Sequence, residues 1–149
     1  MSTEPRIRHS KKFEDLFTLL IDTHHIFESK AQVLLFAAAV GFNEKRRKSV
    51  SNKESFDPIR MATFDNLGTV FKEVMYTIAL AEKEDTSILL DSSADERILI
   101  FEEYASSGLE KIQDIVSHST SPLDALIGFI MNQRSKDSTS DDDIMDYFL

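Results

Sequence analysis

The sequence contains no cysteine, and this absence excludes several classes of protein at once. Without thiols the chain cannot build a disulfide framework, a thiolate zinc site or a cysteine nucleophile. Long hydrophobic runs are also missing, because the longest, residues 33–40, is far shorter than a membrane span of about 20 residues. The first residues, MSTEPR, lack the charged-then-apolar order of a signal peptide. We therefore expect a cytoplasmic protein with no membrane contact.

Sequence motifs of catalysis are absent too. There is no GxGxxG, Walker-type or HExxH pattern, and no internal repeat of fixed period. His24 and His25 are adjacent, so on a helix their side chains would point about 100° apart and make a poor metal site. The acidic pairs 95–96 and 102–103 have no nucleophile beside them. We expect a non-enzymatic protein without cofactor or metal, although carboxylates from distant helices could still assemble a nuclease site.

Charge is divided unevenly along the chain. Residues 1–60 hold 11 Lys and Arg against 8 Asp and Glu, whereas residues 61–149 hold 6 against 18. The first part is therefore basic, and the rest gives the chain its net charge of −9. An acidic protein is poorly suited to indiscriminate nucleic-acid binding, but a local basic face remains available.

Apolar residues recur at helical spacing through most of the chain. Phe13, Leu16, Phe17 and Leu20 form one apolar stripe, and residues 30–41 are apolar nearly all round, which indicates a buried helix. Further helices are expected over 69–84, 94–105, 109–116 and from 122 to about 134. The pattern predicts an all-α fold, a single compact domain of about five or six helices, with one short strand possible near the N-terminus.

Several residues indicate where these helices begin and end. Ser29 to Gln32 and Ser93 to Glu96 form capping boxes, and Ser121 precedes a proline at a first helical position. Asp57 followed by Pro58 predicts another helix start, and Gly68 an interruption. Gly41 is expected to end the second helix and Gly108 to interrupt a later one.

The expected domain organisation has two parts. Residues 1–134 form the helical domain, with residues 1–9 as a flexible arm or short strand and residues 43–56 as a mobile basic loop. Residues 135–149 are expected to form a disordered acidic tail, because they carry too little apolar surface to offset the entropy of ordering.

The N-terminal order, Arg6-Ile7-Arg8 followed by two helices, resembles a ribbon-helix-helix DNA-binding unit. In a strand Arg6 and Arg8 would share one face, and a ribbon made by two chains could place them in a major groove. Ser29 and Lys30 would then meet phosphate at a helix start. This arrangement would require a homo-oligomer. The alternative is an N-terminus that is merely disordered.

A second basic feature is the run Lys45-Arg46-Arg47-Lys48, with more cations nearby in sequence. Adjacent cations attract phosphates through counterion release. A solvated loop that balances the acidic half of the molecule is the competing interpretation. The complete set of candidate nucleic-acid-binding residues is Arg6, Arg8, Lys11, Lys12, Ser29, Lys30, Lys45, Arg46, Arg47, Lys48, Lys53 and Arg60.

The C-terminal segment combines acid with apolar anchors, as segments that fold onto a partner often do. Asp141 to Asp143 precede the candidate partner-binding residues Ile144, Met145, Tyr147, Phe148 and Leu149. A disordered segment that binds nothing is the alternative.

Two stretches together, residues 29–42 (SKAQVLLFAAAVGF) and 95–109 (DERILIFEEYASSGL), resemble the small accessory proteins of bacterial DNA phosphorothioation (dnd) systems. The resemblance runs from about residue 8 to residue 109 and includes no catalytic motif. It implies membership of a defence locus in which sulfur replaces a non-bridging phosphate oxygen of DNA and partner proteins restrict unmodified DNA.

Two hypotheses follow for the function. In the first, the chain is a non-catalytic accessory or regulatory protein that contacts DNA, with or without phosphorothioate, through its basic N-terminal half. In the second, it is an adaptor that binds other proteins of the defence system and never touches DNA.

Overall fold

The computed structural model describes the backbone of residues 5–146 and the side chains of residues 5–136. The chain divides into two compact units, Met1–Lys111 and Ile112–Leu149. We describe each unit by itself.

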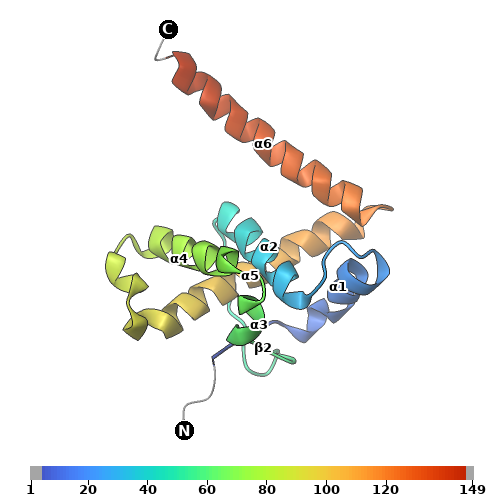
Figure 1. Cartoon of the computed structure of the whole chain (residues 1–149). Coiled ribbons are helices and arrows are strands. Elements are labelled where there is room, and N and C mark those ends of the chain that lie inside the picture. Colours follow the sequence, from blue (N-terminus) through green and yellow to red (C-terminus); the bar gives the residue numbers. More distant parts are fainter. Residues whose placement is uncertain (1–4, 147–149) are drawn as a thin grey trace. The chain divides into compact units, whose positions relative to one another are not determined.

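Helices dominate the described chain, and the expected all-α class is confirmed (Figure 1). The first helical segment is irregular, since a 3₁₀ turn, a short α-helix and a π-helical turn follow one another. The helical elements are η1 (Lys11–Phe13), α1 (Glu14–Phe17), η2 (Thr18–Thr23), α2 (Lys30–Asn43), α3 (Met61–Asp65), α4 (Thr69–Lys83), η3 (Thr86–Leu89), η4 (Asp91–Ser93), α5 (Ala94–Ser117) and α6 (Pro122–Asp146).

Two predicted helix starts are confirmed in detail. The Ser29 hydroxyl accepts a hydrogen bond from the Gln32 amide at 3.2 Å, and the Gln32 side chain accepts one from the Glu28 amide at 2.8 Å. At the start of α6 the Ser121 hydroxyl accepts the Asp124 amide at 3.5 Å. Both caps satisfy amide groups that the first helical turn leaves without partners.

A small two-stranded sheet lies near the N-terminus. Strand β1 (Arg6–Ile7) pairs antiparallel with β2 (Ile59–Arg60) of the same chain, with Arg6 opposite Arg60. The expected helix start at Asp57 is wrong, because Asp57 has a φ of +52° and residues 59–60 form β2. The short strand at Arg6 is present, but its partner is its own chain. The ribbon of a two-chain ribbon-helix-helix unit is thus not confirmed.

Two glycines play a different part from the one predicted. Gly41 lies inside α2 and Gly108 inside α5, which runs without interruption from residue 94 to residue 117. A Cβ atom on Gly41 would lie 2.0 Å from the Tyr104 carbonyl oxygen, and one on Gly108 would lie 1.7 Å from the Ala37 carbonyl oxygen. The glycines therefore allow the backbones of α2 and α5 to touch. Gly68, with a φ of +77°, separates α3 from α4 as predicted.

The core of the first unit is built from aromatic and small side chains. The Phe64 and Phe71 rings stack with centroids 4.5 Å apart, and Phe101 meets both rings edge-on at 5.9 and 5.4 Å. Phe13 and Phe17, from the first predicted apolar stripe, are also buried. These contacts join α3, α4 and α5, while α2 packs against α4.

In the second unit, α6 runs from Pro122 to Asp146 and so continues past the predicted helix end near Arg134. Whether the tail is disordered and whether a domain ends at residue 134 stay predictions. Four large apolar side chains recur along one side of α6 and are 42–54% exposed, namely Leu123, Ile127, Ile130 and Met131. No helix in the described part of the chain is long and apolar enough to cross a membrane.

Candidate functional site: a neutralised basic loop

The loop that follows α2 is anchored by hydrogen bonds to other segments of the first unit. The backbone amide of Lys48 donates to the Glu103 carbonyl at 3.0 Å, and the amide of Phe56 donates to the His9 carbonyl at 3.2 Å. Val50 is buried, with only 3% of its surface exposed. The basic run is therefore held against α4 and α5, although its polar composition had predicted a mobile loop.

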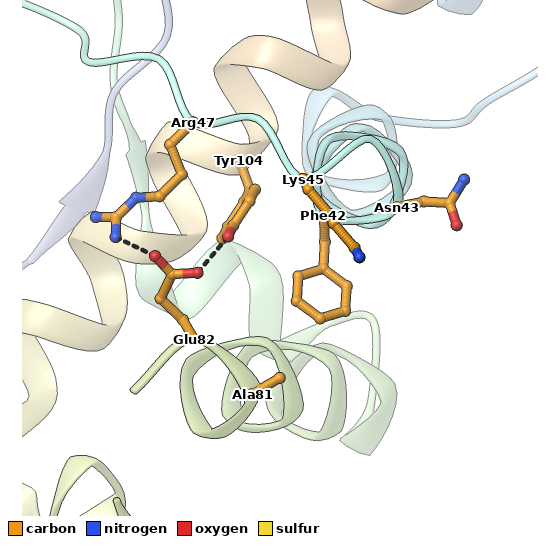
Figure 2. A pocket seen from close by; sticks show the side chains of 7 residues that line it. All are labelled: Phe42, Asn43, Lys45, Arg47, Ala81, Glu82 and Tyr104. Atoms are coloured by element: carbon orange, nitrogen blue, oxygen red, sulfur yellow. Dashed lines mark hydrogen bonds and ion pairs between the residues drawn. The ribbon is translucent and has the colours of Figure 1, made fainter. Parts of the chain in front are cut away.

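Arg47 occupies the centre of this contact (Figure 2). Its guanidinium binds Glu82 of α4 at 2.8 Å and Glu103 of α5 at 3.1 Å, and it lies 5.8 Å from the centroid of the Tyr104 ring. Glu82 also accepts a hydrogen bond from the Tyr104 hydroxyl. One arginine from the loop thus links two helices that are distant in sequence.

The electrostatics of this group follow from its partners. The hydrogen bonds from Tyr104 and Arg47 lower the pKa of Glu82. Burial, together with the Glu82 carboxylate, raises the pKa of Tyr104 to about 12. At neutral pH the site therefore combines an ionised carboxylate, a neutral phenol and a guanidinium that donates to two carboxylates.

A second cluster forms around Glu110 of α5. Its carboxylate binds Lys12 at 3.1 Å and Arg46 at 3.1 Å, and it also binds Lys48. Burial alone would raise the pKa of Glu110, but the hydrogen bonds from Lys48 and Lys12 lower it below its ordinary value. One carboxylate thus neutralises part of the charge of three cations.

Arg8 is bound even more completely. Its backbone amide donates to Glu102 at 2.7 Å, and its guanidinium donates to the same carboxylate from Nε at 3.0 Å and from Nη2 at 2.7 Å. Glu102 is almost fully buried. The Arg8 side chain also reaches Asn52 at 2.7 Å. It therefore fastens β1 to α5, whereas the sequence had suggested a role in a DNA groove.

The other candidate cations are dispersed. Lys30 binds Glu14 at 3.1 Å, and Lys11 lies 5.9 Å from the Phe56 ring centroid. Arg6, Lys45, Lys53 and Arg60 are exposed. Arg6, Ser29, Lys30 and Arg60 come together around one hollow of about 340 Å³, which Asp57 also lines. The side chains of the candidate partner-binding residues Ile144 to Leu149 lie outside the described residues.

A pocket of about 650 Å³ opens beside the Arg47 group (Figure 2). Phe42 and Tyr104 line it with rings at 5.5 Å and nearly perpendicular, and Asn43, Lys45, Arg47, Ala81 and Glu82 complete it. No group of three or more histidine, aspartate or glutamate side chains among the described residues could hold a metal ion. Arg47, Glu82 and Tyr104 bind one another in this pocket, which suits a structural junction better than proton transfer.

Sequence reasoning did not identify the acidic partners of these cations. Glu82, Glu103 and Glu110 and the Tyr104 hydroxyl come from two helices that approach the loop only after folding. The division of charge between the two halves of the sequence was the one available indication. It predicted opposite charges, but not which residues would meet.

The sequence matches a known protein family. A family model described as DNA sulphur modification system-associated protein 4 matches residues 6–147. Searches of curated proteins and of solved structures found no match.

Proposed function

The chain belongs to the DNA sulphur modification system-associated protein 4 family, and we propose that it serves such a system as a non-catalytic adaptor that binds other proteins. This family membership agrees with the resemblance seen in residues 29–42 and 95–109. The proposal selects the second of the two hypotheses drawn from the sequence.

The observation that carries the proposal is the internal pairing of the basic residues. Arg8, Arg46, Arg47 and Lys48 all bind carboxylates of the same chain. These carboxylates belong to the same chain and stay close to the cations, so a DNA phosphate would have to displace them before it could bind. Only that binding would release the counterions of DNA and add affinity. The net charge of −9 adds a general repulsion of DNA. The basic loop therefore serves the fold.

The surface best suited to a protein partner is the apolar side of α6. Leu123, Ile127 and Ile130 recur at helical spacing, and Met131 adjoins them. An exposed stripe of this kind is what an amphipathic helix presents to an apolar groove. The acidic-apolar residues Ile144 to Leu149 follow on the same segment of sequence and extend the proposed partner-binding region.

The adaptor proposal is tested by co-purification with the other proteins of the same sulphur modification system. We expect wild type to retain a partner and Ile127→Asp/Met131→Asp to lose it. Asn132→Asp is the matched control, because residue 132 is exposed and faces away from the stripe. Retention by both variants, and also by a chain lacking residues 144–149, would contradict the proposal.

A second candidate function, contact with DNA, is favoured by one observation. Arg6, Arg60 and Lys30 surround a single hollow at the start of α2, where backbone amides attract phosphate. The test is binding of duplex DNA, with and without phosphorothioate, across a salt series beginning near 50 mM. Wild type is compared with Arg6→Ala/Arg60→Ala and with alanine at residues 45–48. Binding that both variants weaken would favour this function over the adaptor.

A further inference from the structure

We propose that α3, α4 and α5 form a binding site for a carboxylate carried on an apolar peptide segment, and that Arg97 recognises this carboxylate. The inference deepens the proposed function, since it names the chemistry of a partner. The site lies in the first unit, and no described residue of α6 lines it.

Arg97 is unusual among the cations of this chain because it is buried without a counter-charge. Only 5% of its surface is exposed, and among the described residues no carboxylate forms an ion pair with it. Its guanidinium carbon lies 4.6 Å from the Tyr76 ring centroid. A buried charge without an opposite charge is costly, and departures of this kind are found mainly at functional sites.

The hydrogen bonds of Arg97 leave one edge of its guanidinium without an acceptor among the described residues. Nη1 donates to the carbonyls of Ile88 at 2.9 Å and Leu90 at 2.5 Å. Nε is buried and has no hydrogen-bond partner among the described residues, and Nη2 makes none of the hydrogen bonds described for this side chain. The Nε–Nη2 edge is a parallel pair of N–H donors, and this edge suits the two oxygens of a carboxylate.

Arg97 lines a pocket of about 230 Å³ whose other walls are chiefly apolar. Met61, Phe71, Met75 and Ile98 supply carbon surface, Lys72 adds a second cation, and Asp65 is the one carboxylate in the lining. This volume is smaller than the roughly 300 Å³ at which pockets for small molecules begin, so it suits one side chain better than a nucleotide. An apolar wall around a cation favours a carboxylate with carbon neighbours over a hydrated phosphodiester.

An apolar surface adjoins this pocket. Leu90, whose carbonyl holds Arg97, is 58% exposed, and Leu89 before it is 37% exposed. A peptide that places its carboxylate on Arg97 would cover such side chains with its own apolar residues. Charge and apolar area together therefore indicate an acidic-apolar peptide as the occupant.

The test follows the Arg97 Nε–H signal in ¹⁵N NMR spectra of the full chain. The probes are a synthetic peptide with the sequence of residues 140–149, SDDDIMDYFL, and the small acid 4-methylpentanoate. We expect both to shift this signal in a saturable way. The same peptide with its four aspartates changed to asparagine and its C-terminal carboxyl group amidated, and 4-methylpentanamide, should leave it in place. Inorganic phosphate and a short oligonucleotide provide the phosphate comparison.

Two variants locate the site. Arg97→Lys keeps a donor for the two carbonyls but lacks the Nε–Nη2 pair. We expect its peptide affinity, measured by titration calorimetry because this variant has no Arg97 Nε–H, to fall about tenfold or more. Ala94→Leu fills the pocket and keeps the Arg97 side chain, and it should have a similar effect, while Arg46→Lys, on the exposed loop, should not. If neither carboxylate probe moves the signal, if both pocket variants bind as wild type does, or if only phosphate binds, the inference is wrong.

The two proposals fail in different ways. Loss of co-purification in the α6 variants with unchanged peptide binding would leave the Arg97 site intact. Absence of peptide binding at Arg97, with co-purification retained by wild type, would refute the site and leave the adaptor function standing.

Discussion

Arg8 and Glu102 show at the scale of single residues how a charged pair holds the N-terminal strand. Glu102 is 98% buried on α5 and has Arg8 as its cationic partner. We expect Arg8→Ala to lower the free energy of unfolding by about 2 to 3 kcal/mol, because it leaves a buried carboxylate without its cation. Chemical denaturation measures this difference. Lys53→Ala, at an exposed position, is the control, and an equal effect of both variants would refute the assignment.

His9 is buried against Phe17 and its Nε2 lies 3.2 Å from the Asp57 carbonyl oxygen. Burial, followed by the nearby Lys30 ammonium, lowers the pKa of His9 below its ordinary value of 6.5. Below pH 6.5 the unfolded chain therefore takes up a proton that the folded chain resists. His9 should therefore leave the free energy of unfolding unchanged above pH 6.5 and lower it as the pH falls below that value.

This pH dependence is measured as the free energy of unfolding between pH 7 and pH 5. His9→Gln should flatten the profile, whereas His118→Gln should not, because the His118 side chain is 79% exposed. Carboxylates with lowered pKa values, such as Glu82 and Glu110, affect stability at more acidic pH. A wild-type profile that is flat over this range would contradict the role of His9.

At the scale of elements, the crossing of α2 and α5 depends on two residues without side chains. A Cβ on Gly108 would meet the Ala37 carbonyl oxygen at 1.7 Å, and both groups belong to helix backbone that cannot easily move. Gly108→Ala must therefore separate the helices, and we expect a loss of roughly 3 kcal/mol or more, in the range of severe overpacking.

The matched control for this prediction is Gly128→Ala on α6. A Cβ there has no atom within 4 Å, so alanine should leave stability unchanged or raise it by about 0.5 to 1 kcal/mol through its higher helix propensity. Thermal unfolding compares the two variants. A Gly108→Ala protein as stable as wild type would show that the two helices do not touch at this point.

At the scale of the whole molecule, carboxylates of α4 and α5 bind the cations of the basic loop, as the phosphates of DNA would. Glu82→Gln/Glu103→Gln/Glu110→Gln removes three carboxylates and frees Arg46, Arg47 and Lys48. We expect affinity for duplex DNA to rise about tenfold or more at low salt, with a steep salt dependence. A triple variant at exposed acidic positions, Glu28→Gln/Glu73→Gln/Glu84→Gln, changes the net charge equally. The same gain in both would mean that only net charge matters.

How much the sequence could predict depended on how local each feature was. The cap at Ser29, the cap at Ser121 and the break at Gly68 were predicted correctly, since each involves residues within a few positions of one another. The predictions that Gly41 ends a helix and that Gly108 interrupts one were wrong. The role of both glycines lies in a contact between residues about 70 positions apart, and a single sequence contains no sign of such a contact.

The candidate site divides in the same way. The sequence by itself determined a cysteine-free, acidic, helical chain with a basic run at residues 45–48, because composition and periodicity are written directly in the order of residues. Only the tertiary structure decided that Arg47 meets Glu82 and Glu103, and that Arg97 is buried without a counter-charge. The physical reason is that the electrostatic free energy of a charged side chain depends on which groups lie near it in space. The tertiary structure determines those groups, and the order of residues along the chain does not show them.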